Sequence, residues 1–179
     1  MRWVRRYSAL GEHGLAWLGL GLLGAALDRP ARSRWIRATA VVGCAYLTSS
    51  SIKWSIGRAR PVVEDLPHLM ATPTGLSFPS SHSTSSFAAA RAFTGLLPAG
   101  PLYCAATAMA LSRLYLGVHY PSDVLGGIIV GLAWAAFCMA TLEASLVIGR
   151  RRAPKEVHEV PSPKEVEDAH APKQEVAAV

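Results

Sequence analysis

The sequence predicts an all-α fold: a polytopic membrane helical bundle of about five spans, followed by a disordered C-terminal tail. Three observations lead to this fold class. Hydrophobic residues make up 51% of the 179 residues, and the arginines gather at the ends of apolar segments that carry almost no charge themselves. The composition also changes abruptly at Arg150, where a charged stretch poor in aromatic residues begins. We therefore expect a membrane domain over residues 1–149 and a tail over residues 150–179.

The first apolar segment follows a basic N-terminus, a combination that is also typical of a signal peptide. No small-x-small cleavage motif leads into a soluble domain, however, and further apolar segments follow. We therefore expect a first membrane helix over about residues 9–27. A second helix is predicted to begin among three arginines at positions 32, 34 and 37 and to end at about residues 51–53.

The remaining helices are separated by polar stretches that carry turn signals. Residues 62–78 are rich in proline and too polar to span a membrane, so they predict a loop or a short interfacial helix. A third helix is expected from about residue 80 to Leu97 and a fourth over about residues 101–114. The fifth follows Asp123 and is apolar to about residue 148, with glycines that suit close helix packing.

The stretch SRLYLGVHYPSD, residues 112–123, places three chemically active side chains between two apolar segments. An imidazole such as that of His119 can attack phosphorus when a carboxylate fixes its tautomer and a guanidinium holds the phosphoryl oxygens. Asp123 and Arg113 supply these two groups. Polar residues at a membrane boundary can also simply face water, and this stretch alone leaves that alternative open.

Two upstream stretches favour the catalytic interpretation. In KWSIGRARP, Lys53 and Arg60 are seven residues apart, so they share a helix face if the helix continues to the proline. The alternative is a cluster of cations at the membrane edge that has no further function. In PSSHS, a serine can cap a helix whose first turn carries His82, and the N-terminus of such a helix attracts anions. The alternative is a serine cap with no role in binding anions. With five spans, all three stretches lie on the same side of the membrane.

Taken in order, the three stretches resemble the signature motifs of the type 2 phosphatidic acid phosphatase superfamily, which includes membrane lipid phosphatases and the vanadium haloperoxidases. The first has Lys53 followed after six residues by Arg60 and proline, the second is PSSH, and the third is SR with His119 and Asp123 at the family spacing. Ser81 stands where the family usually has glycine. Because serine still offers a backbone N–H, we expect a small effect. The resemblance covers residues 53–123.

The resemblance implies a two-step phosphoryl transfer by an integral membrane phosphoric ester hydrolase. His119 would attack phosphorus to form a phosphohistidine, Asp123 would orient its ring, and His82 would protonate the leaving group and then activate water. The phosphate-binding residues that the resemblance implies are Lys53, Arg60, Ser80, Ser81 and Arg113.

We expect neither a cofactor nor a metal, because no carboxylate cluster suited to Mg²⁺ accompanies these residues. The three cysteines, Cys44, Cys104 and Cys138, lie in apolar segments without a CxxC motif, so we expect small buried side chains rather than ligands.

The resemblance also implies a lipid phosphate as substrate and the bilayer as its setting. We favour a polyprenyl-linked phosphate used in cell-envelope synthesis, such as decaprenylphosphoryl-5-phosphoribose. Undecaprenyl diphosphate, phosphatidylglycerophosphate and phosphatidate are the alternatives. A different class of function is a non-catalytic membrane scaffold whose repetitive tail binds a partner that the sequence does not identify. The net charge of +6 does not indicate a nucleic-acid partner, because the basic residues mark segment ends.

The arginine distribution predicts the orientation of a multi-pass protein in the bacterial cell (inner) membrane. With five spans, more arginines flank the non-catalytic side than the catalytic side, and cytoplasmic flanks carry the excess of positive charge. We therefore expect an extracytoplasmic catalytic face. The arginines of the non-catalytic side are Arg29, Arg32, Arg34, Arg37, Arg150, Arg151 and Arg152, against Arg2, Arg5, Arg6 and Arg58 on the catalytic side.

Overall fold

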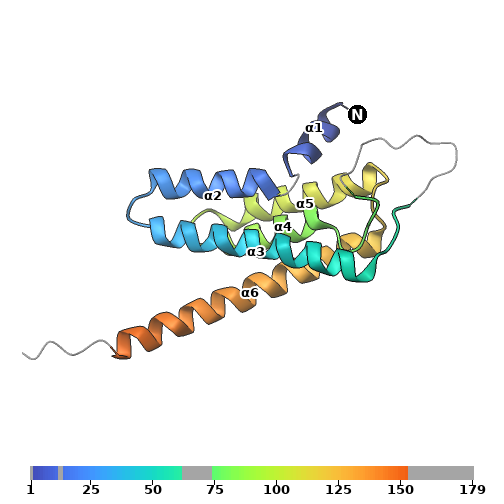
Figure 1. The fold of residues 1–179 in the computed structure, drawn as a ribbon. Coiled ribbons are helices and arrows are strands. Elements are labelled where there is room, and N and C mark those ends of the chain that lie inside the picture. The colour runs from blue at the N-terminus through green and yellow to red at the C-terminus, as the bar shows by residue number, and fades with distance from the viewer. Residues whose placement is uncertain (1, 12–13, 62–73, 153–179) are drawn as a thin grey trace, which may run out of the picture. The chain divides into compact units, whose positions relative to one another are not determined.

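The computed structural model describes residues 2–11, 14–61 and 74–152, and this part of the chain is helical (Figure 1). It divides into two compact units, Met1–Ala144 and Ser145–Val179, and the account below concerns the first. The predicted tail beyond Arg152 lies outside the described residues. The helices are α1 (Arg2–Leu10), α2 (Leu15–Leu27), α3 (Arg32–Ile56), α4 (Ser81–Phe93), α5 (Ala99–Tyr115) and α6 (Pro121–Arg152).

The prediction of one continuous helix over about residues 9–27 is wrong. The structure has two helices here, and α2 begins after Gly14, whose φ of 71° lies in the left-handed region that interrupts a right-handed helix. Among the described residues, one segment, Pro121–Ser145, is both long and apolar enough to cross a bilayer, while Leu15–Leu27 is apolar but shorter. The helical fold class is confirmed.

Helix α3 begins at Arg32, within the predicted arginine cluster, and ends at Ile56, a few residues beyond the predicted end at about residues 51–53. It does not continue to Pro61, which was the condition for Lys53 and Arg60 to share a helix face. Gly57 adopts φ 67° and donates its N–H to the carbonyl of Lys53 at 3.0 Å, which caps the last turn. The chain then runs on without helix, and the Arg60 N–H donates to the Gly75 carbonyl at 3.2 Å. Arg60 therefore does not share a helix face with Lys53.

Helix α4 lies at the centre of the packing, and every side chain from Ser83 to Ala90 is buried. Most of these side chains are small, which lets neighbouring helices approach closely. A Cβ atom on Gly127 of α6 would lie 2.6 Å from the Ser80 carbonyl oxygen, so only glycine fits at this contact. The helix ends at Phe93, four residues before the predicted Leu97.

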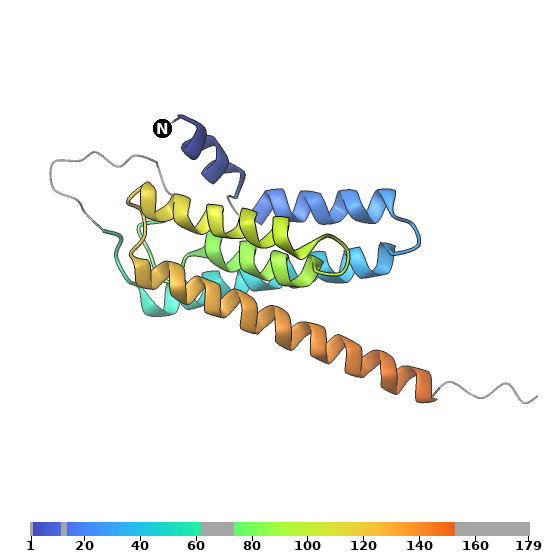
Figure 2. The same ribbon diagram turned by 180° about the vertical axis from the view of Figure 1, so that it is seen from behind.

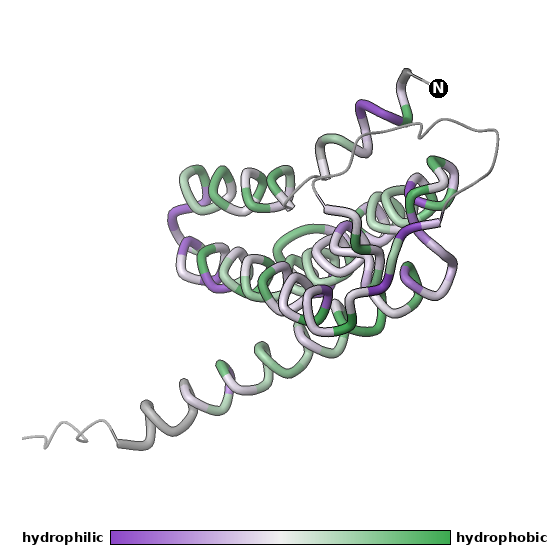
Figure 3. Tube along the Cα trace, turned by 45° about the vertical axis from the view of Figure 1, so that its right-hand side comes forward, coloured by the Kyte–Doolittle hydropathy of each residue, from purple (hydrophilic) through white to green (hydrophobic). Residues whose placement is uncertain are grey.

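Apolar side chains of α2, α3, α4, α5 and α6 form the core, in which the rings of Trp35 and Phe93 lie 5.5 Å apart. Figure 3 shows the hydrophilic stretches at the α2–α3 turn and in the loops at the other end of these helices. The expectation of buried cysteines is wrong for Cys44 and Cys104, which are exposed, while Cys138 is half-buried. An apolar segment predicts a helix in an apolar environment. It does not predict whether a given side chain lies on the face of that helix that packs against the core or on the face that points outward.

Candidate active site

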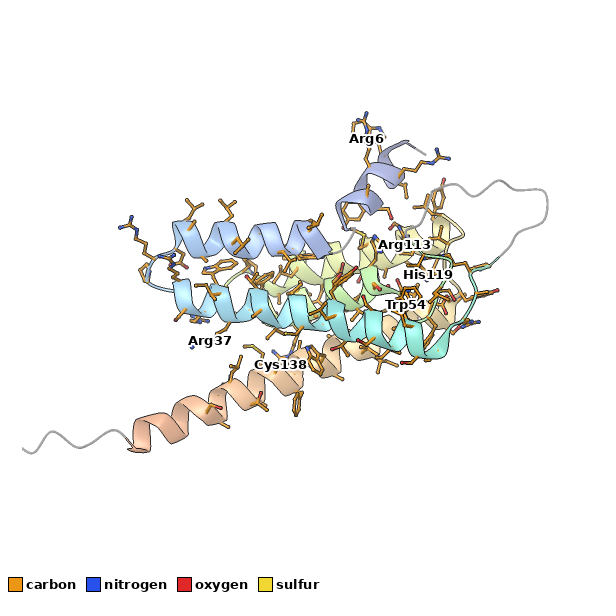
Figure 4. The ribbon with its side chains drawn as sticks, viewed as in Figure 1. Arg6, Arg37, Trp54, Arg113, His119 and Cys138 are labelled. Carbon is orange, nitrogen blue, oxygen red and sulfur yellow. The ribbon has the colours of Figure 1, made fainter. Side chains whose placement is uncertain are left out.

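The residues of the three sequence motifs gather at one end of the bundle, which we call the site end. Here α3 ends, α4 begins, α5 ends and α6 begins, as Figures 1 and 2 show from opposite sides. Figure 4 shows Arg113 and His119 at this end, well away from Arg37 on the α2–α3 side. Motif residues that are far apart in the sequence are therefore near one another in the fold.

His119 is buried, with 5% of its surface exposed, in the loop between α5 and α6. Its Nε2 lies 3.2 Å from Arg60 Nη1, and its Nδ1 lies 3.4 Å from Asp123 Oδ2. The second distance is within ion-pair range, although the angles are not those of a hydrogen bond. Burial, reinforced by the positive charges of Arg60 and Arg113, holds the pKa of the imidazole far below its usual range. The ring is therefore neutral at neutral pH.

Asp123 is fully buried in the first turn of α6. Pro121 begins this helix, and Asp123 Oδ2 accepts the backbone N–H of Tyr120 at 2.8 Å, which is the reciprocal bond of a capping box. The Asp123 backbone carbonyl accepts the N–H of Ser80 at 2.9 Å, which ties the second motif to the third. Helix capping thus places the carboxylate beside His119.

Lys53 lies in the last turn of α3 and is buried. Its Nζ donates to the backbone carbonyls of Pro79 at 2.9 Å, Ser77 at 3.3 Å and Leu76 at 3.4 Å. The ammonium group therefore holds the chain that leads into the second motif, with its positive charge next to the start of α4.

The two motif arginines approach from different elements. Arg60 is held by the carbonyls of Thr74, at 2.9 Å from Nε, and Val118, at 2.8 Å from Nη1. Arg113, in the last turn of α5, is 2% exposed, and its guanidinium donates to the hydroxyl of Ser8 on α1. Both guanidinium groups are thus fixed by neighbouring chain segments before any ligand binds.

The second motif begins α4 as predicted. Ser80 is the N-cap, and its hydroxyl oxygen accepts the N–H of Ser83 at 3.4 Å. Ser81 is the first helical residue, so its backbone does not need the positive φ that glycine allows. Its hydroxyl accepts a hydrogen bond from Ser49 at 3.1 Å. His82 lies in the first turn, and its buried Nε2 has no hydrogen-bond partner among the described residues.

This geometry agrees with comparison to known proteins. The family model of the PAP2 superfamily matches residues 34–146, which include every motif residue named above. The chain belongs to the PAP2 superfamily. The resemblance found in the sequence is therefore confirmed, and the family together with the phosphatases described next supports a phosphoric ester hydrolase.

Three known PAP2 proteins illustrate the similarity. A decaprenylphosphoryl-5-phosphoribose phosphatase of Mycolicibacterium smegmatis is 43% identical over 127 residues, which cover 69% of both chains. One of Mycobacterium tuberculosis is 41% identical over 156 residues, covering 85% of this chain and 83% of the relative. The crystal structure of a transmembrane PAP2 type phosphatidylglycerolphosphate phosphatase from Bacillus subtilis superposes with a TM-score of 0.62 at 25% identity, covering 80% and 76% of the two chains.

Sequence reasoning missed one arginine of this PAP2 site. We counted Arg58 only as a positive charge flanking a span, yet its Nη1 donates to Asp123 Oδ1 at 2.9 Å. Its position between Lys53 and Arg60 in the first motif was the only available signal. Ser8 was also missed, because nothing in the sequence of α1 connects it with Arg113.

Among the described residues, the site contains several cations and one carboxylate. Arg60, His119 and Asp123 lie in direct proximity, and Ser80 joins them through its backbone. Lys53 and Arg113 act on the imidazole through their charge. Within the described ranges, no three His, Cys, Asp or Glu side chains come together as a metal site. Such a cluster of fixed positive charge is suited to a phosphate group.

Proposed function

We propose that this PAP2 protein removes the phosphate group from decaprenylphosphoryl-5-phosphoribose, a polyprenyl-linked sugar phosphate, in cell-envelope synthesis. Two relatives that carry this activity in their names are 43% and 41% identical to the chain, and the second match covers 85% of it. The site supports a phosphate headgroup of this kind, because several cations converge on one buried imidazole. The substrate identity rests on the relatives, while the reaction chemistry rests on the site.

The first chemical step is attack of His119 Nε2 on phosphorus. Asp123 near Nδ1 favours the tautomer that carries its proton there, which leaves a lone pair on Nε2 that faces Arg60 Nη1 at 3.2 Å. The lowered pKa of His119 keeps this lone pair available at neutral pH. A phosphoryl group whose oxygen accepts the hydrogen bond of Arg60 forms the P–N bond with Nε2 while the P–O bond to the leaving alcohol breaks. His82, in its protonated form, gives its proton to the leaving oxygen and becomes neutral.

The second step returns the enzyme to its starting state. Water attacks the phosphohistidine, His82 takes the proton of that water, the P–N bond breaks and inorganic phosphate leaves. Lys53, Arg60 and Arg113 neutralise the charge that spreads over the phosphoryl oxygens. The backbone N–H of Ser81 at the start of α4 adds a hydrogen-bond donor, while that of Ser80 is held by the Asp123 carbonyl. These residues supply the stabilisation for which other phosphatases use a metal, so we propose a metal-independent reaction.

The observation that carries the proposed chemistry is the position of His119 between Asp123 and Arg60. The two ring nitrogens lie 3.4 Å from the carboxylate and 3.2 Å from the guanidinium. A histidine that only stabilised the fold would not require a buried carboxylate on one side and a cluster of cations on the other.

For the membrane arrangement, we propose that α2, α3, α4, α5 and α6 cross the inner membrane, with the site end at the extracytoplasmic edge. Arg29 in the α2–α3 turn and Arg32 and Arg34 in the first turn of α3 would then face the cytoplasm. We further propose that residues 1–149 form the phosphatase domain and residues 150–179 a solvated extension.

Cysteine labelling tests this orientation in a background without the three native cysteines. Ser55→Cys lies at the site end and Pro30→Cys in the α2–α3 turn, and both positions are exposed. On intact cells, a membrane-impermeant thiol reagent should label position 55 and not position 30. Labelling of position 30 alone would show that the site end faces the cytoplasm.

The substrate proposal is tested by phosphate release from purified protein in detergent. The panel contains decaprenylphosphoryl-5-phosphoribose, undecaprenyl diphosphate, phosphatidylglycerophosphate and phosphatidate, each also given to the His119→Ala variant as a blank. We expect the highest kcat/KM for the first. A higher kcat/KM for another lipid would identify that lipid as the substrate instead. If no lipid in the panel released phosphate, the scaffold alternative would be favoured.

A further inference from the structure

Arg58 joins the first motif to the turn that begins α6 through three contacts. Its Nη1 donates to Asp123 Oδ1 at 2.9 Å and to the hydroxyl of Ser122 at 2.8 Å. Its guanidinium carbon lies 4.1 Å from the ring centroid of Tyr120, in a cation–π contact. All three partners belong to residues 120–123, so one side chain braces the whole turn.

The two carboxylate oxygens of Asp123 have different partners. Oδ2 accepts the Tyr120 N–H at 2.8 Å and faces His119 Nδ1 at 3.4 Å, while Oδ1 accepts from Arg58. Asp123 is fully buried, and among the described residues Arg58 is the donor to Oδ1. A buried carboxylate oxygen without a donor is costly, so loss of Arg58 favours rotation of the carboxyl group away from its present orientation.

Arg58 is placed differently from the arginine beside the imidazole. Arg60 Nη1 lies 3.2 Å from His119 Nε2, where the phosphoryl group would bind. Arg58 instead approaches the opposite side of the Asp123 carboxylate, and its side chain is 38% exposed. Its backbone carbonyl accepts the Ser77 N–H at 2.7 Å, which fixes the start of the side chain.

We propose that Arg58 is a positioning residue, which holds the Asp123 carboxylate so that Oδ2 faces Nδ1 of His119. This inference rests on the proposed function, because the orientation of Asp123 matters only if His119 is the nucleophile. Arg58 acts through Asp123 and does not bind the phosphate. It therefore raises kcat without contributing to substrate affinity.

A double-mutant cycle with Asp123→Asn tests this role in the full-length protein. We expect Arg58→Gln to lower kcat about ten- to a hundredfold, as when groups that orient a functional histidine are removed, with KM and the inhibition constant of inorganic phosphate nearly unchanged. In the Asp123→Asn background, Arg58→Gln should have almost no further effect on kcat. Arg58→Lys keeps the charge but loses the planar stacking on Tyr120, so its kcat should be intermediate. Arg34→Gln is the matched control.

Two results would overturn the proposal. One is an equal loss of kcat from Arg58→Gln with and without Asp123→Asn. The other is a higher KM and weaker inhibition by inorganic phosphate at unchanged kcat, which would make Arg58 a phosphate ligand. Should Arg58→Gln not fold, the same comparisons apply to Arg58→Lys. Failure of the proposed function looks different, because wild type and His119→Ala would then release phosphate equally or not at all.

Discussion

The two ends of the helical bundle both carry arginines near helix termini, but they use them differently. At the α2–α3 turn, Arg34 is exposed and donates one hydrogen bond to the Gly95 carbonyl at 3.0 Å. At the site end, Arg113 is 2% exposed and Lys53 is 6% exposed, and both raise the positive potential at one imidazole. The same residue types are solvated at one end and buried together at the other.

This contrast shows that the site is distinguished by several buried cations lying near one imidazole, and not by positive charge alone. Burying a cation is costly, and burying several near one another adds repulsion. Such an arrangement persists because the fold holds each group through backbone carbonyls, as for Lys53 and Arg60. A phosphate group would relieve the repulsion, whereas the exposed arginines of the other end need no ligand.

The largest expected effect on activity comes from a substitution at the site end. His119→Ala removes the proposed nucleophile and should lower kcat about 10⁴-fold or more, while Asp123→Asn should leave residual activity. Phosphate release at saturating substrate measures both. Wild-type turnover in His119→Ala would end the phosphohistidine mechanism.

The second prediction concerns the source of positive charge. Because side chains at the site end supply it, activity should persist in excess EDTA, and vanadate, which mimics pentacoordinate phosphorus, should inhibit. The measurement is initial rate after chelation and dialysis. An enzyme that loses activity in EDTA and regains it with Mg²⁺ would show that the cations described here are insufficient.

The third prediction compares helix packing near the site with packing on α2. In Gly127→Ala, the new Cβ would lie 2.6 Å from the Ser80 carbonyl oxygen, so backbone must move, and we expect a loss of about 1–3 kcal/mol of stability. Gly19→Ala is the matched control, since nothing lies within 4 Å of its Cβ. Thermal unfolding in detergent compares the two. Equal melting temperatures would mean that α6 does not pack closely on α4.

The smallest effect is expected at the α2–α3 end. Arg34→Ala removes one exposed hydrogen bond, so stability should fall by less than about 1 kcal/mol and kcat/KM should stay unchanged. Kinetics and a melting curve on one preparation test this. A large loss of activity in this variant would show that the two ends are coupled.

The apolar segments of the sequence were sufficient to predict the helical fold class, and the motif spacing was sufficient to predict most of the residues that the structure brings together at the site end. The start of α3 among its arginines and the capping of α4 by Ser80 follow from local rules, and the structure confirms both. The apolar pattern placed the end of α3 at about residues 51–53, a few residues too early. The helix continues to Ile56 and ends at the left-handed Gly57, whose backbone geometry the apolar pattern does not register.

Contacts between segments that are far apart in the chain could not be predicted from the sequence. Arg58 and Asp123 are separated by 65 positions, and their contact depends on how the chain after α3 turns back toward α6. The contact of Ser8 with Arg113 depends in the same way on the placement of α1. The exposure of Cys44 also required the structure, since an apolar segment has outward and inward faces.

The measurement that tests the central claim most directly is identification of the phosphorylated residue. Purified enzyme is mixed with a phosphate-labelled lipid substrate, quenched within one turnover at alkaline pH and digested for mass spectrometry. We predict an acid-labile phosphate on His119, absent from the His119→Ala variant and present in Arg34→Ala. Label on another residue, or full turnover with no covalent phosphoenzyme in any quench, would contradict the account.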